Sequence, residues 1–254
     1  MQVVAVIPAY NEKKAVRDVA RAAAPFVQCV IVVDDGSTDR TSEAAREAGA
    51  RVVHHALNRG LGAALGTGFA AALALGADAV VTLDADGQHD PSEIPLFLAA
   101  LSGGADLVVG SRMRTGLVGM PLHRKAATLV GNLATLLLFG AWVTDSQSGY
   151  RALSRRALER IDIRTNRMEV SSELIHETRV KGLVYTEVSI RAIYTDYSLS
   201  KGQSFTVGVR TLMKLILRRL VPCYLPLCPS FRFFSPSWLP LPSYAPGSSF
   251  RMGT

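Results

Sequence analysis

The chain has 254 residues, of which 48% are hydrophobic and 19% charged, so it is long and apolar enough for one folded α/β domain with an appendage. This composition excludes an intrinsically disordered protein. The net charge of +7 favours phosphate-rich ligands or an anionic membrane surface, and it leaves nucleic acid open as a partner. Three cysteines without metal-ligand spacing favour a reducing compartment, and no apolar run reaches the roughly 20 residues that span a bilayer.

Apolar β-branched runs alternate with helical patterns through the first half of the chain. The predicted strands are Val3–Ile7, Cys29–Val33, Val52–His55, Ala79–Leu83 and Asp106–Gly110. The predicted helices are Glu12–Ala24, Asp39–Ala48, Asn58–Leu75 and Pro91–Leu101. This alternation is typical of a mostly parallel sheet with helices on both faces, in which the carboxyl ends of the strands share one edge.

The second half of the chain is less regular. It is predicted to contain helices at Leu122–Phe139 and Glu169–Lys181, a strand at Val184–Ile193, and polar loops at 144–151 and 194–204. Thr206–Val221 is predicted to form a basic amphipathic helix. Residues 222–254 are rich in proline and lack acidic residues, so they are predicted to be unstructured or an aberrant terminus. We therefore expect three parts: 1–204, 205–221 and 222–254.

The strongest chemical signal is the segment Asp84-Ala85-Asp86-Gly87-Gln88, which follows a buried strand. Two carboxylates separated by one small residue favour Mg²⁺ or Mn²⁺, with phosphates and water completing the coordination. The alternative is a surface turn whose aspartates cap the next helix. His89 is expected to be a neighbour of that cap, because such a site requires oxygen ligands.

Other polar segments follow the strands of the same predicted edge. They are Pro8–Glu12, Asp34-Asp35, Asn58–Gly60 and Ser111-Arg112, and the separate polar loop in the second half contains Asp145–Arg151. The glycine-rich segment after Asn58 lacks the Lys-Ser/Thr ending of a phosphate-binding P-loop. Asp145 could be a general base and Arg151 could bind phosphate, or the two could form a structural ion pair.

These motifs, in this order, resemble glycosyltransferases of family 2. The quoted motifs are P-A-Y-N-E, V-D-D-G-S-T-D, N-R-G-L-G, L-D-A-D-G-Q-H-D-P, G-S-R and D-S-Q-S-G-Y-R. The resemblance covers roughly residues 2–204 and is nearest to dolichyl-phosphate mannose synthases and prokaryotic polyprenyl-phosphate sugar transferases. It implies a GT-A fold, which is a Rossmann-like α/β fold for nucleotide-diphospho-sugar transfer, over the whole of the first part.

The resemblance also implies roles for individual residues. The nucleoside would be held by Pro8, Tyr10, Glu12, Val33 and Asp35. The metal and the diphosphate would be held by Asp84, Ala85, Asp86 and Gln88, with Asp84, Asp86 and Gln88 as the metal set.

Three basic residues receive roles in the same way. Arg112 would contact the donor phosphate, and Arg124 the acceptor phosphate. Lys201 would lie on a loop that closes on the donor. The family has an arginine six residues before that lysine, where this chain has Thr195, so Arg191 is predicted to substitute for it.

The implied reaction moves a hexose of the mannose or glucose type from GDP-mannose or UDP-glucose, with inversion, to a polyprenyl phosphate. Asp86, Arg112, Arg124 and Asp145 are the predicted catalytic residues. The partners would be the donor, the acceptor and a membrane surface, with no nucleic acid. The enzyme would lie peripherally on the cytoplasmic face of the membrane, where the helix at 206–221 could bind anionic lipids or pack on the sheet.

Three other functions remain in competition. A family-2 transferase with a hydroxyl acceptor would need a general base, for which Asp145 is the candidate. A sugar nucleotidyltransferase would also use an aspartate pair at a sheet edge. A catalytically inactive binding subunit would result if the unusual terminus disturbed the fold.

Overall fold

The computed structural model describes residues 1–114, 128–133, 135–136, 140, 142–191 and 193. Arg124, Lys201, the predicted helix Thr206–Val221 and the predicted tail 222–254 lie outside these residues, as does most of the predicted helix Leu122–Phe139. The part of that helix that is described, 128–133 and 135–136, is helical. Among the described residues, no helix is both long and apolar enough to cross a membrane.

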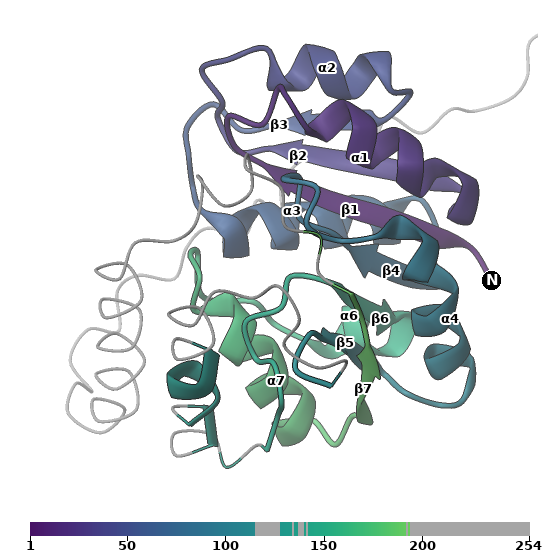
Figure 1. The fold of residues 1–254 in the computed structure, drawn as a ribbon, viewed down its shortest axis with the longest axis vertical. Helices are drawn as coiled ribbons and strands as arrows, with labels where there is room; N and C mark the ends of the chain where they lie inside the picture. Colours follow the sequence, from purple (N-terminus) through teal and green to yellow (C-terminus); the bar gives the residue numbers. More distant parts are fainter. Residues whose placement is uncertain (115–127, 134, 137–139, 141, 192, 194–254) are drawn as a thin grey trace, which may run out of the picture.

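Seven strands form one sheet in the order β3-β2-β1-β4-β6-β5-β7 (Figure 1). Six of them run parallel, and β6 runs antiparallel between β4 and β5. The predicted mostly parallel α/β sheet is therefore confirmed. The strands are β1 Val3–Ala9, β2 Cys29–Asp34, β3 Arg51–His54, β4 Ala79–Thr82, β5 Leu107–Ser111, β6 Arg151–Ser154 and β7 Tyr185–Ser189.

Helices cover both faces of the sheet because side chains along each strand point alternately to opposite faces. In β1, Val3, Ala5 and Ile7 belong to one apolar core, and Val4 and Val6 belong to the other. The first core is covered by α1 Val16–Ala23, α2 Thr41–Glu47 and α4 Ile94–Ser102, which follows a 3-10 turn at Pro91–Glu93. The second is covered by α3 Leu61–Ala74, α6 Arg155–Arg160 and α7 Val170–Val180.

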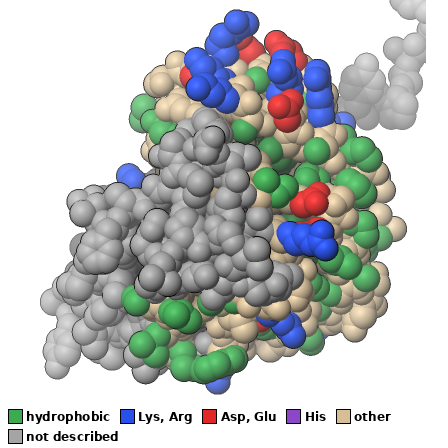
Figure 2. Space-filling view, in the orientation of Figure 1, with side chains coloured by type: hydrophobic (Ala, Val, Ile, Leu, Met, Phe, Trp, Pro, Cys, Tyr) green, Lys and Arg blue, Asp and Glu red, His purple; other side chains and the backbone are tan. Residues whose placement is uncertain are grey.

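Charged side chains of both signs lie together on α1 and α2, at the top of the face shown in Figure 2. Arg17 of α1 is 3.8 Å from Glu47 of α2, and Arg40 pairs with Glu43. The side chains of these pairs are at least about half exposed, so solvent screens both pairs and they contribute little to stability.

The structure corrects three boundaries. The helix predicted from Glu12 begins at Val16, since a turn at 13–15 precedes it. The helix predicted from Asn58 begins at Leu61, because Asn58–Gly60 wraps around the Asp35 side chain. The polar loop predicted to end at Arg151 is followed by β6 and α6, which were not predicted because their four and six residues are too short to show a clear period.

Gly68 sets how closely α3 approaches the sheet. A Cβ at this position would lie 2.3 Å from Val6 Cγ1 and 3.3 Å from Val33 Cγ2. Both valines are fully buried, so neither side chain has space into which to move. The glycine therefore allows α3 to lie directly on β1 and β2.

Gly68→Ala is expected to lower the free energy of unfolding by about 1–3 kcal/mol, because the added methyl group overpacks the core. Gly66 lies in the same helix, and a Cβ added there would meet no atom within 4 Å, so Gly66→Ala is the matched control. That control should stabilise by up to about 1 kcal/mol, since alanine favours a helix interior. Urea unfolding followed by circular dichroism measures both, and equal effects of the two substitutions would contradict this account.

Candidate active site

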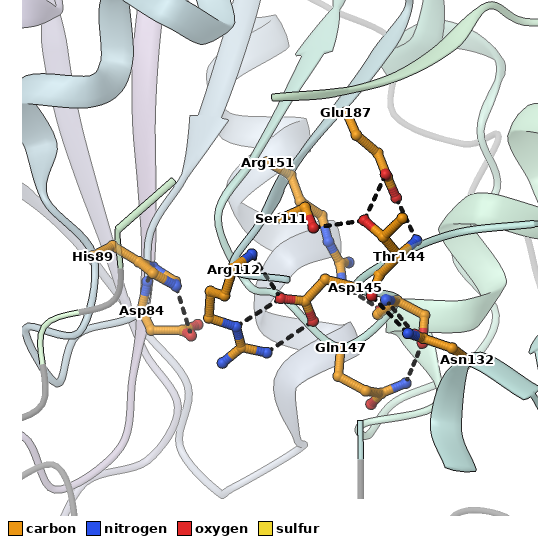
Figure 3. A network of polar contacts seen from close by, with 11 residues as sticks. Asp84, His89, Ser111, Arg112, Asn132, Thr144, Asp145, Gln147, Arg151 and Glu187 are labelled. Carbon is orange, nitrogen blue, oxygen red and sulfur yellow. Dashed lines mark hydrogen bonds and ion pairs between the residues drawn. The ribbon is translucent and has the colours of Figure 1, made fainter. Parts of the chain in front are cut away.

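The carboxyl ends of β1, β2, β4 and β5 meet at one edge of the sheet, and β6 begins there because it runs the opposite way. The predicted polar segments after β1, β2, β4 and β5 are thus brought together. Arg151, at the start of β6, pairs in register with Thr82 of β4 and Val109 of β5. Figure 3 shows this part of the edge, with Asp84 and His89 on one side of Arg112 and Asp145 on the other.

Asp84 lies just beyond the end of β4, and its carboxylate fits into a space left by Gly149. A Cβ on Gly149 would lie 2.3 Å from Asp84 Oδ1 and 2.5 Å from Oδ2. Thr82 Oγ1 donates to the Gly149 carbonyl at 2.7 Å and holds the two segments at this separation. Any other residue at position 149 would displace this carboxylate.

Asp86 is oriented by Gln88. The main-chain N–H of Gln88 donates to Asp86 Oδ1 at 3.0 Å, and its side-chain amide donates to Oδ2 at 2.5 Å. Gln88 was predicted to be a metal ligand, and that role stays a prediction, because its amide nitrogen donates to Asp86 whereas a metal would bind the amide oxygen. Ala85 is buried in the core, so its side chain does not line the site and only its backbone could face a ligand.

Both aspartates lie where negative charge is unfavourable unless a cation balances it. Burial raises the pKa of the Asp84 carboxyl, although Arg151 and Arg112 oppose the shift. Burial and the nearby charge of Asp84 together raise the pKa of Asp86. A divalent cation bound by these oxygens would relieve their repulsion.

The residues present fit a divalent metal whose other ligands come from a substrate. No group of three or more His, Cys, Asp or Glu side chains in the described part of the chain could hold a metal ion by itself. Mg²⁺ and Mn²⁺ are commonly held by one or two carboxylates together with phosphate oxygens and water. The carboxylate oxygens of Asp86 and the neighbouring Asp84 are therefore the kind of ligands expected at a metal–diphosphate site.

His89 supports Asp84 from inside the protein. Its Nδ1 accepts from the Asp84 main-chain N–H at 3.2 Å, its Nε2 lies 3.7 Å from Asp84 Oδ2, and its ring stacks on Tyr150. Burial is the main cause that lowers the pKa of His89 to about 4. A neutral imidazole that accepts at Nδ1 carries its proton on Nε2, the nitrogen on the Asp84 side.

Arg112, directly after β5, is bound by Asp145. Arg112 Nε donates to Asp145 Oδ2 at 2.7 Å, Nη2 donates to Oδ1 at 2.9 Å, and the Arg112 main-chain N–H donates to Oδ2 at 3.1 Å (Figure 3). Asp145 is fully buried, whereas the Arg112 side chain is 18% exposed. The pair therefore fixes the guanidinium in a bidentate geometry, and part of the Arg112 side chain remains exposed.

This geometry corrects the interpretation of segment 145–151. Asp145 pairs with Arg112, so the predicted structural pair with Arg151 is wrong. Both oxygens of the fully buried Asp145 accept from Arg112, which does not suit a general base. Arg151 is 2% exposed and its Nη2 donates to the Ser146 carbonyl at 3.4 Å, so it lies beneath the site rather than at a phosphate-binding surface.

A pocket lies on the β1–β2 side of the edge. It is a shallow pocket of about 140 Å³ lined by Pro8, Ala9, Tyr10, Asp35, Asn58, Gly60, Leu61 and Ala64. Three of the residues predicted to hold a nucleoside, Pro8, Tyr10 and Asp35, thus line one pocket. Tyr10 is 46% exposed, so its ring is available to stack on a planar ligand.

Val33 and Glu12 do not line this pocket. The Val33 side chain is fully buried in the core against α3, so a contact of this residue with the nucleoside would be made by its backbone and stays a prediction. Glu12 lies at the first turn before α1, where its N–H donates to Thr41 Oγ1 at 2.8 Å.

Asp35 organises the floor of the pocket. Its carboxylate accepts from the N–H groups of Arg59 at 2.9 Å and Gly60 at 2.7 Å, and His55 Nδ1 lies 2.7 Å from Oδ1. Asn11 adopts a left-handed backbone with φ of 55°, and its side chain accepts from Thr38. Such a strained backbone is common at functional sites, and here it joins the loops after β1 and β2.

The chain after β7 passes over the aspartate segment. The Arg191 N–H donates to Glu93 Oε1 at 3.0 Å, and the Ile193 N–H donates to the Gln88 carbonyl at 2.9 Å. Arg191 is exposed, so its guanidinium is accessible near the segment that holds Asp86.

Comparison with known proteins adds independent findings. Residues 4–162 match the family model of glycosyl transferase family 2. An uncharacterized protein of Methanocaldococcus jannaschii is 41% identical over 86% of this chain and 93% of its own length. UDP-N-acetylglucosamine–dolichyl-phosphate N-acetylglucosaminyltransferase of Methanococcus voltae is 34% identical over 85% of this chain and 95% of its own length.

A solved structure shares the fold. Glucosyl-3-phosphoglycerate synthase from Mycobacterium tuberculosis, crystallised with Mn²⁺, UDP-glucose and phosphoglyceric acid, matches with a TM-score of 0.66 and 26% identity. The match covers 86% of this chain and 79% of that chain.

Gly149→Ala is expected to weaken Mn²⁺ binding in the presence of a nucleoside diphosphate by roughly 10- to 100-fold, because the methyl group displaces the Asp84 carboxylate. Calorimetric titration measures the affinity. Gly66→Ala, whose added Cβ would meet no atom within 4 Å, serves as the control for a generic glycine replacement. Unchanged affinity in Gly149→Ala would show that the position of Asp84 does not matter for the metal.

Proposed function

This chain belongs to glycosyl transferase family 2, and we propose that it transfers a sugar from a nucleoside diphosphate sugar to a polyprenyl phosphate. One observation carries the proposal: the Asp84–Asp86 segment lies between the Tyr10 pocket and the Arg112–Asp145 pair on one sheet edge. A nucleoside and its diphosphate are joined in that same order, with Arg112 at the diphosphate end. The M. voltae relative is named for transfer to a dolichyl phosphate, which supports the acceptor class.

The two halves of the site suit two parts of the donor. We propose that the nucleoside binds in the pocket of Pro8, Tyr10 and Asp35. Asp84 and Asp86 would hold Mg²⁺ or Mn²⁺, which when bound neutralises charge on the diphosphate. The partly exposed Arg112 would stabilise the charge that develops on the leaving diphosphate.

The acceptor chemistry follows from the state of Asp145. A lipid phosphate is anionic near neutral pH, so it can attack the anomeric carbon without a general base, and attack from the side opposite the diphosphate inverts the configuration. A hydroxyl acceptor would require a base. Asp145 was the predicted base, but its oxygens are bound by Arg112, so the geometry favours the phosphate acceptor.

Three basic residues and the donor complete the proposal. Arg124 is proposed to bind the acceptor phosphate, and Lys201 and Arg191 the donor. The donor is proposed to be GDP-mannose or UDP-glucose. UDP-N-acetylglucosamine is a further candidate, because the M. voltae relative is named for that donor.

We propose that the enzyme works at the cytoplasmic face of a membrane, where its acceptor lipid lies. Four large apolar side chains in the segment before the Asp145 loop are more than half exposed: Leu129, Val130, Leu133 and Trp142. Exposed apolar groups of this kind can enter the interfacial region of a bilayer, with the aromatic ring at the level of the headgroups. They support membrane contact independently of the basic segment 206–221.

Asp86→Ala is expected to abolish formation of lipid-linked sugar, with a loss of at least about 100-fold in kcat, because the leaving charge is no longer balanced. The assay follows radiolabelled sugar into the organic phase with Mn²⁺ present. Asp18→Ala is the control, since that side chain is 74% exposed on α1. Full activity in Asp86→Ala would refute the assignment, and release of pyrophosphate would identify a nucleotidyltransferase.

The donor is expected to be found by testing GDP-mannose, UDP-glucose and UDP-N-acetylglucosamine in turn. The nucleotide sugar that binds should raise the melting temperature of the protein with Mn²⁺ present, and much less with EDTA. A ligand at 100 times its Kd adds about 2.7 kcal/mol to stability by mass action. Tyr10→Ala should reduce the shift by removing the stacking surface of the pocket. If no nucleotide sugar stabilises the protein with Mn²⁺, it is an inactive member of the family.

A further inference from the structure

We propose that Glu187, on strand β7, is a positioning residue that fixes Arg112 through Thr144 and Asp145. The inference rests on the proposed function, in which Arg112 stabilises the leaving diphosphate. The hydrogen bonds of the Glu187 carboxylate go to Thr144 and Tyr185 rather than to the Arg112 guanidinium or the aspartate pair. Its influence would therefore pass through the loop that precedes β6.

Glu187 is saturated by donors from two elements. Its Oε1 accepts from the Thr144 N–H at 2.8 Å and from the Tyr185 hydroxyl at 2.7 Å, and its Oε2 accepts from Thr144 Oγ1 at 2.7 Å. Burial, with the hydrogen bond to Glu187 adding to it, raises the pKa of Tyr185, so this hydroxyl stays a donor. Only a carboxylate offers acceptor positions on both oxygens for these three donors.

Thr144 is thereby held through all of its polar groups. Its Oγ1 lies 2.5 Å from Ser111 Oγ, and its carbonyl accepts from Asn132 Nδ2 at 2.6 Å (Figure 3). Ser111 is fully buried and directly precedes Arg112. Glu187 therefore fixes the backbone of the loop at 144 relative to the end of β5.

Asp145 carries this constraint to the site. It follows Thr144, and its carboxylate binds both the main-chain N–H and the guanidinium of Arg112. A shift of Thr144 would move Asp145, and this would change the orientation of the Arg112 guanidinium. The register of β7 on β5, which pairs Glu187 with Val109, places the start of this chain of contacts beside the strand that leads into Arg112.

Glu187→Gln tests the mechanism because glutamine has the same shape as glutamate. It replaces one of the two carboxylate oxygens with an NH₂ group, a donor, and that group would face a donor of Thr144. This substitution should lower kcat by roughly 10- to 100-fold, which is the usual effect of displacing a catalytic group by about 1 Å. The KM for the donor should stay within about threefold of the wild-type value. Glu159→Gln is the matched control, since Glu159 is half exposed on α6 and pairs with Arg155.

A double-mutant cycle separates positioning from simple destabilisation. Arg112→Lys keeps a positive charge but cannot make the bidentate pair, so in that background Glu187→Gln should cost less than about twofold in kcat. Equal losses in both backgrounds would overturn the inference, and so would the absence of any loss in Glu187→Gln. Thr144→Ser, which keeps the hydroxyl, should retain more activity than Thr144→Val.

A crystallographic measurement does not depend on the assay. In the structure of Glu187→Gln, the Arg112 guanidinium is expected to leave its bidentate contact with Asp145, and an unchanged contact would overturn the inference. If the wild-type chain forms no lipid-linked sugar, the proposed function fails, and the crystal structure still decides whether Glu187 positions Arg112.

Discussion

The hydrogen bonding of β6 to both β4 and β5 is the constraint on which the site depends. Because β6 runs antiparallel to its neighbours, it begins at the edge where they end. Gly149 and Arg151 therefore arrive beside the end of β4, and Gly149 leaves the space that the Asp84 carboxylate occupies. A parallel strand in this place would bring its last residues to the edge and would remove the direct connection between the loop at 145 and the sheet.

The balance of charge around this edge explains why it suits a cation. The carboxylates of Asp84 and Asp145 lie near the positive charges of Arg112 and Arg151, Asp86 lies near Asp84, and burial keeps His89 neutral near pH 7. One guanidinium is paired with Asp145, and the other lies beneath the site. A bound divalent cation would leave the aspartate pair able to attract a diphosphate rather than repel it.

The strands could be predicted from the sequence because they show a local periodicity. The polar segments that follow them could be predicted to lie together because parallel strands end at the same edge of a sheet. The sequence could not predict which side chains pair. Arg112 and Asp145 are 33 residues apart, and their contact follows from the tertiary structure alone. The sequence also could not predict which residues of a motif are buried, as Val33 is, because that depends on how the strand is turned in the sheet.

The pocket on the β1–β2 side and the surroundings of Arg112 are organised by the same kind of contact, in which a buried carboxylate accepts from main-chain N–H groups. Asp35 accepts from the N–H groups of Arg59 and Gly60. Asp145 accepts from both the N–H and the guanidinium of Arg112. Main-chain donors persist when a side chain is substituted. A substitution of Arg112 would therefore remove the guanidinium contact proposed for the donor phosphate, while the main-chain contact with Asp145 would still hold the loop.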